Sequence, residues 1–181
     1  MRIQAGNLKY KKIKYIKDDR LRPTRNIVKK SFFDTVSTII DGCVFLDLFA
    51  GVGSVGIEAI SRGAREAIFV DNSFRSIKMI KENIGLSGCE SRSVVVKSDA
   101  ASFVSNKDIM KKVDIVYMDA PYGYDIYDLL EKLFLNVNKN AIICIEHSSK
   151  NELEEKIGEF SNIKRRKIGK NILDYFGVVN V

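Results

Sequence analysis

The sequence predicts an α/β fold: a doubly wound, mostly parallel seven-stranded sheet, extended at the N-terminus by a β-hairpin and a helix. Apolar runs of strand length alternate with helical patterns from residue 41 onward. Strands that are apolar almost throughout are typical of a parallel sheet covered by helices on both faces. A glycine-rich loop joins the first run to the first helical pattern. With 45% of its 181 residues hydrophobic, the chain can bury its own core.

Residues 1–24 are expected to form a basic arm before a domain over residues 25–181. Apolar residues alternate loosely with cations over residues 2–16, and Gly6-Asn7 suits the bend of a β-hairpin. Residues 1–30 hold eleven basic and two acidic side chains, a net charge of +9, so the remaining 151 residues sum to −2. A basic arm on a near-neutral body is typical of nucleic-acid binding, although a solvated lysine-rich surface has the same composition.

The remaining elements follow from apolar periodicity and from capping residues. Thr24 suits the N-cap of a helix that continues to residue 40, and Gly63 should end the helix that follows the glycine loop. Strands are expected at residues 43–48, 67–70, 93–97, 114–118, 141–146, 163–168 and 173–179. Further helices are expected at residues 55–62, 73–86, 99–104, 125–135 and 151–157.

The glycine loop follows the first strand of the domain. Gly51, Gly53 and Gly56 have the spacing G-x-G-x-x-G, and Asp71 ends the next strand. This spacing alone also fits a dinucleotide site, in which the helix N-terminus holds a pyrophosphate and the acid holds a ribose. Asp47, just before the loop, would repel a pyrophosphate but suits a ligand with ammonium and sulfonium groups.

A second motif, Asp119-Ala120-Pro121-Tyr122, follows the fourth strand, at the usual ligand crevice of such sheets. An exocyclic amine is a poor nucleophile, because its lone pair is conjugated into the ring. The Asp119 carboxylate and the Ala120 carbonyl could accept its two N–H groups and offset the charge that develops during attack. Tyr122 could stack on a base swung out of its helix. The motif therefore indicates methylation of an amine.

Together these motifs resemble those of class I S-adenosylmethionine-dependent methyltransferases, whose fold is Rossmann-like. The loop resembles their motif I, and the turn resembles the D/N-P-P-Y/F signature of enzymes acting on adenine N6, guanine N2 or glutamine, with alanine replacing the first proline. By this resemblance Asp71 binds the ribose hydroxyls and Asp99 the adenine amino group. It implies S-adenosylmethionine binding by Asp47, Phe49, Ala50, Gly51, Gly53, Asp71, Asn72, Asp99, Ala100 and Asp119, and catalysis by Asp119, Ala120, Pro121 and Tyr122.

The N-terminal residues narrow the resemblance further. Residues 1–6 and the segment Leu21-Arg22-Pro23-Thr24-Arg25 are similar to the arm of the bacterial 16S ribosomal RNA methyltransferases that modify guanine 966 at N2. The resemblance implies a guanine-N2 methyltransferase acting on small-subunit particles, as a cytoplasmic monomer. It implies RNA contacts by Arg2, Lys9, Lys11, Lys12, Lys14, Arg22, Thr24 and Arg25.

Other function classes are opposed by the sequence or remain open. Cys43, Cys89 and Cys144 form no C-x-x-C pair, so neither a disulfide framework nor a metal site is expected. The apolar stretches are too short for a membrane span. Asp47 opposes a nicotinamide oxidoreductase. An adenine-N6 methyltransferase and a non-catalytic RNA-binding assembly factor remain alternatives. The lone histidine, His147, is expected to be structural, and the cations at residues 164–167 to protect a sheet edge.

Overall fold

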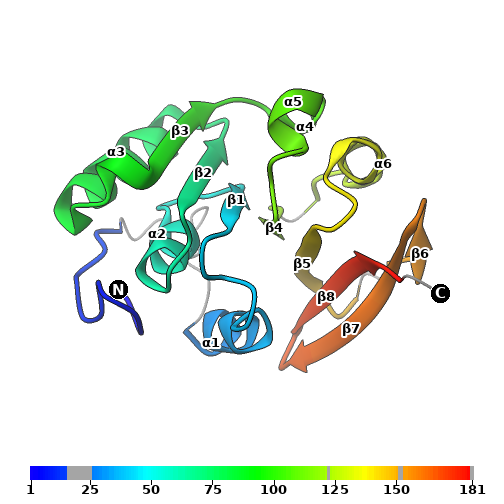
Figure 1. Cartoon of the computed structure of the whole chain (residues 1–181), viewed down its shortest axis with the longest axis horizontal. Coiled ribbons are helices and arrows are strands. Elements are labelled where there is room, and N and C mark those ends of the chain that lie inside the picture. The colour runs from blue at the N-terminus through cyan, green and yellow to red at the C-terminus, as the bar shows by residue number, and fades with distance from the viewer. Residues whose placement is uncertain (16–25, 122, 151–152, 180–181) are drawn as a thin grey trace.

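The computed structural model describes residues 1–15, 26–121, 123–150 and 153–179, and its centre is one twisted mixed sheet (Figure 1). Its strand order is β3-β2-β1-β4-β5-β8-β7-β6. The first five strands in this order pair in parallel, and the last three are antiparallel additions. The strands are β1 Val44–Leu48, β2 Glu66–Asp71, β3 Ser93–Lys97, β4 Ile115–Asp119, β5 Ile142–Ser148, β6 Lys156–Ile157, β7 Phe160–Ile168 and β8 Asn171–Val178.

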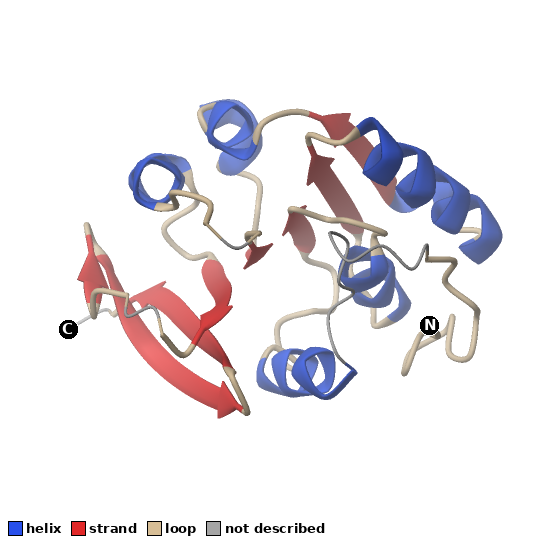
Figure 2. Ribbon diagram, turned by 180° about the vertical axis from the view of Figure 1, so that it is seen from behind, coloured by secondary structure: helices blue, strands red, loops and turns tan. Residues whose placement is uncertain are grey.

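Helices cover both faces of the sheet, as expected for a doubly wound fold (Figure 2). One buried cluster joins the arm, α1, α2 and α3 to inward residues of the sheet, and a second joins α4, α5 and α6 to the opposite face. The helices are α1 Asn26–Thr35, α2 Ser54–Ser61, α3 Phe74–Ser87, the 3-10 helix η1 Glu90–Arg92, α4 Ala100–Val104, α5 Lys107–Met110 and α6 Tyr127–Asn136.

The helix expected at residues 151–157 is wrong over its described part. Lys156 and Ile157 form the short strand β6, which makes the sheet eight-stranded, not seven-stranded. Gly158, with φ +60°, turns the chain so that Ile157 pairs with Phe160. This backbone conformation favours glycine, and it allows a tight hairpin at a point where the apolar pattern had suggested a helix. Residues 151 and 152 lie outside the described residues.

Helix α1 ends at Thr35, five residues before the expected end. The side chains of Thr35 and Ser37 donate hydrogen bonds to backbone carbonyls of the preceding turn, and such bonds compete with regular helix. The turn that follows still buries Val36 and Ile40, whereas Ile39 is exposed. The proposed cap, Thr24, lies outside the described residues.

The arm doubles back on itself as expected, but over residues 1–15 the pairing consists of a single antiparallel bridge, Arg2 to Lys12. Its apolar residues, Ile3, Leu8 and Ile13, are buried in the same cluster as α1, α2 and α3. The arm is therefore packed against the domain along its described length, and this packing replaces the strand ladder of a longer hairpin.

Gly56 allows α2 to approach β2 closely. A Cβ atom at Gly56 would lie 2.3 Å from Cε1 of Phe69, a fully buried ring on β2. The buried ring leaves no room for this methyl group, because the core around it is close-packed. Gly56 therefore fixes how deeply the glycine loop and α2 sit on the sheet.

We expect Gly56→Ala to lower the free energy of unfolding by about 2 kcal/mol or more, the cost of overpacking a core. Gly85→Ala in α3 is the matched control, because its Cβ would meet nothing closer than 3.8 Å. There the change should raise stability by about 1 kcal/mol through helix propensity. Urea unfolding of both variants measures the difference, and equal effects would contradict the close-approach explanation.

Candidate active site at the carboxyl ends of the parallel strands

The glycine loop between β1 and α2 adopts a strained backbone. Phe49, Gly51 and Gly53 have φ values of 61°, 57° and 77°. The two glycines adopt this region without a steric penalty, whereas Phe49 has a Cβ atom and is strained. The Phe49 ring contacts Tyr124 edge-on, with 5.0 Å between ring centroids. The loop is thus held in one conformation at the ligand edge of the sheet.

Two carboxylates hold this loop in place. Asp71 accepts hydrogen bonds from the backbone N–H groups of Gly51 and Ser73, each at 2.9 Å. Asp47 accepts one from Gly56 N–H at 2.9 Å. Hydrogen bonds from backbone donors to a carboxylate are among the stronger ones in proteins. The loop is therefore anchored to the ends of two neighbouring strands, β1 and β2.

Asp47 lies deeper than its expected role implies. Its carboxyl group is only 2% exposed, and burial raises its pKa to about 8, against the opposing effects of the Gly56 N–H and the Lys29 ammonium. Asp71 is half-buried, Asn72 is exposed, and the neighbouring Ala50 is buried. Thus Asp71 and Asn72 reach the surface beside the loop, and Asp47 lies beneath it.

Asp99 caps α4 at the end of β3. Its carboxylate accepts a hydrogen bond from Ser102 N–H at 3.0 Å and lies 3.5 Å from the Tyr124 hydroxyl. Burial and the Asp99 charge raise the pKa of Tyr124. Ala100, the next residue, is buried. Tyr124 thus joins the Asp99 region to Phe49, a link that the sequence motifs did not indicate.

The predicted catalytic turn leaves the sheet beside the glycine loop. Leu48 pairs in register with Met118, so the residues that follow β1 and β4 leave the same edge of the sheet. Asp119 and Ala120 are half-buried, Pro121 is exposed, and Tyr124 N–H donates to the Pro121 carbonyl at 3.1 Å. Tyr122 lies outside the described residues. The structure therefore brings the Asp-Ala-Pro segment next to the loop.

A buried polar group lies behind this turn. Glu146 on β5 pairs in register with Asp119, and it accepts hydrogen bonds from the Tyr117 hydroxyl and the Asn171 side chain. Burial and the Glu146 carboxylate raise the pKa of Tyr117 well above its ordinary value. The Tyr117 phenol therefore remains protonated and donates to Glu146, which fixes the end of β5 against β4.

His147 belongs to a separate ion cluster, consistent with a structural role. Its Nε2 lies 2.9 Å from Asp174, which also accepts a bidentate contact from Arg165. Burial of Asp174 raises its pKa, but hydrogen bonds from His147 and Arg165 outweigh this effect and lower it below the ordinary value. The cluster ties β5 to β8 and β7, at the antiparallel end of the sheet.

The arm's cations divide into two groups. Lys11 donates to the Ser87 carbonyl at 2.6 Å and Lys14 pairs with Glu82, so both are engaged by α3. Arg2 and Lys12 contact no carboxylate within the described ranges, and the Lys9 ammonium lies 4.9 Å from the ring centroid of its neighbour Tyr10. The other predicted RNA contacts, Arg22, Thr24 and Arg25, lie outside the described residues.

One buried amide connects the arm to the glycine loop. Asn83 on α3 accepts a hydrogen bond from Lys14 N–H at 2.8 Å and donates to the carbonyls of Lys14 and Val52, each at 2.9 Å. Its side chain is fully buried. Local sequence patterns do not indicate this link, because Asn83 lies 69 and 31 positions from its partners.

A buried ion pair joins α1 to α2. Lys29 contacts Glu58 at 3.0 Å with both side chains fully buried, and Arg62 contacts the second Glu58 oxygen at 2.9 Å. Lys29, which adds to the basic count of residues 1–30, is therefore not available to a partner. An unpaired charge in this position would be costly, so the pair fixes α1 on α2.

The described residues contain no cluster of three or more His, Cys, Asp or Glu side chains that could hold a metal ion. Cys43, Cys89 and Cys144 are buried and free, and burial raises the pKa of each thiol, consistent with core residues. Within the same ranges, the helices are too short or too polar to cross a membrane.

The strand order, the glycine loop at β1 and the acidic turn at β4 define the class I methyltransferase fold. A solved Escherichia coli structure, provisionally described as methyltransferase yhhF, has this fold with a TM-score of 0.84, at 24% identity over 97% of this chain and 96% of that one. The chain belongs to the family described as conserved hypothetical protein 95, whose sequence model matches residues 1–177.

Two curated relatives place the family more narrowly. YlbH of Bacillus subtilis, provisionally named an rRNA methyltransferase, is 30% identical over 174 residues, 93% of this chain and 94% of that protein. Ribosomal RNA small subunit methyltransferase D of Haemophilus influenzae is 29% identical over 150 residues, 81% of this chain and 78% of that protein. The similarity to each relative covers most of this chain.

The raised pKa of Asp47 predicts a pH-dependent stability. Because the folded-state pKa of about 8 exceeds the ordinary 3.8, folding favours the protonated acid, and the free energy of unfolding falls as pH rises from 4 to 8. Asp47→Asn replaces the titrating acid with a neutral amide. The free energy of unfolding of the variant, minus that of the unchanged protein, should therefore increase from pH 4 to pH 8, by up to about 1.4 kcal/mol per pH unit. Urea unfolding at several pH values measures this. A difference that is constant with pH would contradict the buried acid.

Asn83→Ala should lower the free energy of unfolding by about 2–3 kcal/mol, because it leaves the buried Val52 carbonyl and the part-buried backbone groups of Lys14 without these bonds. Glu82→Ala is the control, since it removes only the exposed pair with the Lys14 side chain, which should contribute less than about 1 kcal/mol. Thermal and urea unfolding of both variants test this. An equal decrease in the free energy of unfolding for the two variants would show that the hydrogen bonds of Asn83 stabilise the fold no more than the exposed Glu82 ion pair does.

Proposed function

We propose that this protein transfers a methyl group from S-adenosylmethionine to the exocyclic N2 of a guanine in 16S ribosomal RNA, within small-subunit particles. The observation that carries the proposal is the position of Asp119, Ala120 and Pro121 at the end of β4, beside the glycine loop that ends β1. The name of the Haemophilus influenzae relative, an rRNA small subunit methyltransferase, supports ribosomal RNA as the substrate.

The residues at the loop fit such a cofactor. A Cβ placed at Gly51 would have no neighbour closer than 4.0 Å, which leaves open space above the loop. Asp71 is half-buried at the end of β2, where one carboxylate can serve ribose hydroxyls, and Asp99 lies at the end of β3 beside Tyr124. When bound, S-adenosylmethionine would supply an electrophilic methyl group, whose bond to sulfur breaks as the amine nitrogen attacks, leaving a neutral thioether. Asp71 and Asn72 would hold the ribose, Asp99 and Ala100 would hold the adenine, and residues 47–53 would surround the methionine end.

The turn provides positioning and electrostatic stabilisation. The Asp119 carboxylate and the Ala120 carbonyl accept the two N–H groups of the guanine amine, hold its lone pair toward the methyl group and stabilise the positive charge that forms on nitrogen. No strong base is needed before attack, because the nitrogen becomes acidic once methylated. Its proton then passes to Asp119 or to water. Tyr122 stacks on the flipped base.

The arm, residues 1–24, supplies the RNA contacts in this proposal. Arg2, Lys9 and Lys12 are the described cations that α3 does not engage, and Arg22, Thr24 and Arg25 extend the set. Contacts of this kind bind phosphates without reading the sequence, so affinity should fall as salt concentration rises.

Methyl transfer to small subunits tests the proposal. We expect the purified protein to transfer labelled methyl groups from S-adenosylmethionine to subunits from a strain lacking the modification, with N2-methylguanosine as the product. Subunits that already carry the modification are the control. N6-methyladenosine, or no transfer to any RNA, would overturn the assignment. Calorimetry with a nicotinamide dinucleotide should detect no binding, which would exclude an oxidoreductase.

Asp119→Ala should lower the rate constant of transfer by about 10²–10³-fold, the typical effect of removing one electrostatic contact to a developing charge. Its affinity for S-adenosylmethionine, measured by calorimetry, should change far less. Asp128→Asn, an exposed carboxylate paired with Lys132 on α6, is the control and should leave transfer unchanged. Full activity of Asp119→Ala would show that the Asp119 carboxylate has no part in methyl transfer. Absence of methyl transfer by the unchanged protein would favour the alternative that the protein is a non-catalytic assembly factor.

A further inference from the structure

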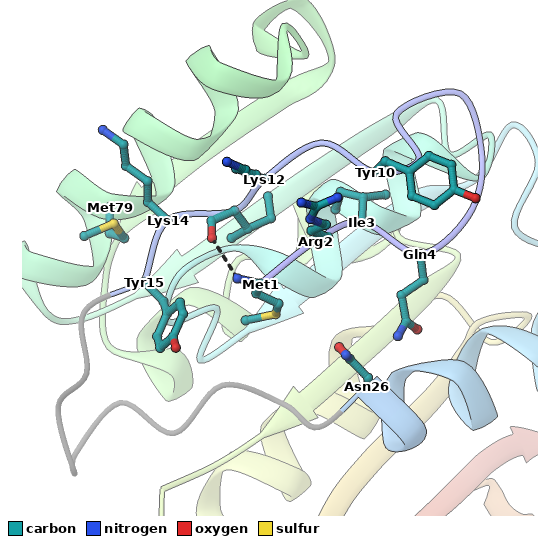
Figure 3. A pocket seen from close by; sticks show the side chains of 11 residues that line it. Met1, Arg2, Ile3, Gln4, Tyr10, Lys12, Lys14, Tyr15, Asn26 and Met79 are labelled. Atoms are coloured by element: carbon teal, nitrogen blue, oxygen red, sulfur yellow. Dashed lines mark hydrogen bonds between the residues drawn. The ribbon is translucent and has the colours of Figure 1, made fainter.

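The arm encloses an open hollow with the start of α1 and with α3, of about 900 Å³ (Figure 3). We name it the arm hollow. Its polar and aromatic lining residues are Arg2, Gln4, Tyr10, Lys12, Lys14, Tyr15 and Asn26. It is separate from the glycine loop and from the turn after β4. Its cations are among the residues expected from the sequence to contact RNA, but Tyr10 and Tyr15 had no predicted role.

The arm hollow has a positive lining. Arg2, Lys12, Lys14 and the N-terminal ammonium surround it, and no described residue that lines it is acidic. Lys14 is neutralised by Glu82, and the N-terminal ammonium donates to the Ile13 carbonyl at 3.3 Å. Arg2 and Lys12 have no carboxylate partner within the described ranges, and an anionic ligand would complement their charges.

Tyr10 is held in an unfavourable conformation without compensation from burial. Its φ is +71°, a region that costs a residue with a Cβ atom about 1 kcal/mol or more, and its side chain is 66% exposed. A glycine there would adopt the same backbone without the penalty. The Tyr10 N–H donates to the Ile3 carbonyl at 3.0 Å and so closes the turn of the arm, but a glycine could make the same backbone bond. The tyrosine side chain is therefore not required by the turn, and it presents an aromatic ring to solvent. Tyr15, also at the hollow, is 49% exposed.

We infer that the arm hollow binds an unpaired segment of RNA, with phosphates at Arg2 and Lys12 and a base stacked on Tyr10. Cations next to exposed aromatic rings are typical of single-strand binding, because every base has a stacking face and every nucleotide carries a phosphate. A duplex keeps its bases stacked inside the helix, so none is available to Tyr10. A peptide made of acidic residues alone, such as polyglutamate, has no aromatic ring that could stack on Tyr10. The inference rests on the proposed function, which identifies RNA as the substrate. It adds that the bound RNA is unpaired and that it binds in the arm hollow.

The arm hollow is linked physically to the proposed cofactor loop. Lys14, in its wall, shares the buried Asn83 side chain with Val52 of the glycine loop. RNA bound in the arm hollow would therefore contact a segment whose backbone is hydrogen-bonded to Asn83, the same side chain that is hydrogen-bonded to the glycine loop. The hollow can thus act as an anchor that holds the RNA while a nearby guanine enters the transfer site.

Binding of a labelled unpaired oligouridylate, followed by fluorescence anisotropy, tests the inference. Tyr10→Ala and Tyr10→Gly should each weaken binding about tenfold, the typical contribution of one stacked base. Tyr10→Gly should also keep or raise the midpoint of thermal unfolding, because it relieves strain, so a loss of binding cannot be attributed to unfolding. Leu135→Ala, which removes another exposed apolar side chain at the end of α6, should change nothing. Unchanged affinity in both Tyr10 variants would overturn the inference.

Tyr10→Trp gives a direct readout of stacking. The chain has no tryptophan, so the new indole would be the only one, and its fluorescence should be quenched by the unpaired RNA. A duplex of the same length and polyglutamate should quench it far less. Equal quenching by either would show a general anion site or a different partner, and would overturn the inference.

Charge variants complete the test. Lys12→Ala should weaken binding and reduce the slope of log affinity against log salt concentration by about one. Lys112→Ala, which removes an exposed lysine before β4, should change neither quantity. In the transfer assay, Tyr10→Gly should raise KM for the RNA substrate several-fold with kcat nearly unchanged. Transfer with unchanged KM would overturn this inference alone. Tyr10-dependent RNA binding without any methyl transfer would instead overturn the proposed function.

Discussion

The attachment of the glycine loop to two acidic side chains, those of Asp71 and the buried Asp47, is the constraint on which the rest of the site depends. Asp47 and Asp71 accept backbone N–H groups of Gly56 and Gly51 from the ends of adjacent strands. A loop with three positive φ values is unfavourable as a free chain, and these bonds, with the packing of Phe49, hold it in one conformation. Because β1 lies at the middle of the parallel strands, between β2 and β4, fixing this loop also fixes its distance from Asp71 on one side and from the Asp119 turn on the other.

Two buried polar links extend this constraint to the N-terminal elements. Asn83 bonds both to Lys14 of the arm and to Val52 of the loop, and the Lys29–Glu58 pair fixes α1 on α2. Neither link contributes much net stability compared with apolar packing, since desolvation offsets most of the gain. Nevertheless, a buried polar or charged group that loses its partner is costly. The arm and α1 can therefore each pack against the domain in only one position. These links support a rigid arrangement, in which the arm surface proposed to bind RNA and the loop proposed to bind a cofactor keep fixed positions relative to each other.

Much of this structure followed from local sequence, and the exceptions share a cause. Apolar runs located the five parallel strands, and the G-x-G-x-x-G spacing located the loop, because both signals lie within a few neighbouring residues. The burial of Lys29, the engagement of Lys11 by α3 and the Asn83 bridge depend on partners far along the chain, which periodicity does not contain. The false helix at residues 151–157 arose because a short apolar-polar pattern fits both element types, and the pairing of Ile157 with Phe160 decided for a strand. The binding and catalytic roles of all the site residues remain predictions, and for Tyr122, Arg22, Thr24 and Arg25 the described residues do not give a position either.

The departure at Ala120 bears on how the turn stays rigid. A proline at that position would restrict φ and remove a backbone donor, which stiffens a turn before any contact is made. Here Pro121 still steers Ala120 toward extended angles, and Tyr124 supplies contacts that a proline cannot. Its N–H closes the turn on the Pro121 carbonyl, its ring packs on Phe49, and its hydroxyl lies 3.5 Å from Asp99. The turn is therefore fixed to the glycine loop and to the end of β3 by one side chain. Rigidity that the family signature places in the backbone is supplied in this chain by packing across the crevice.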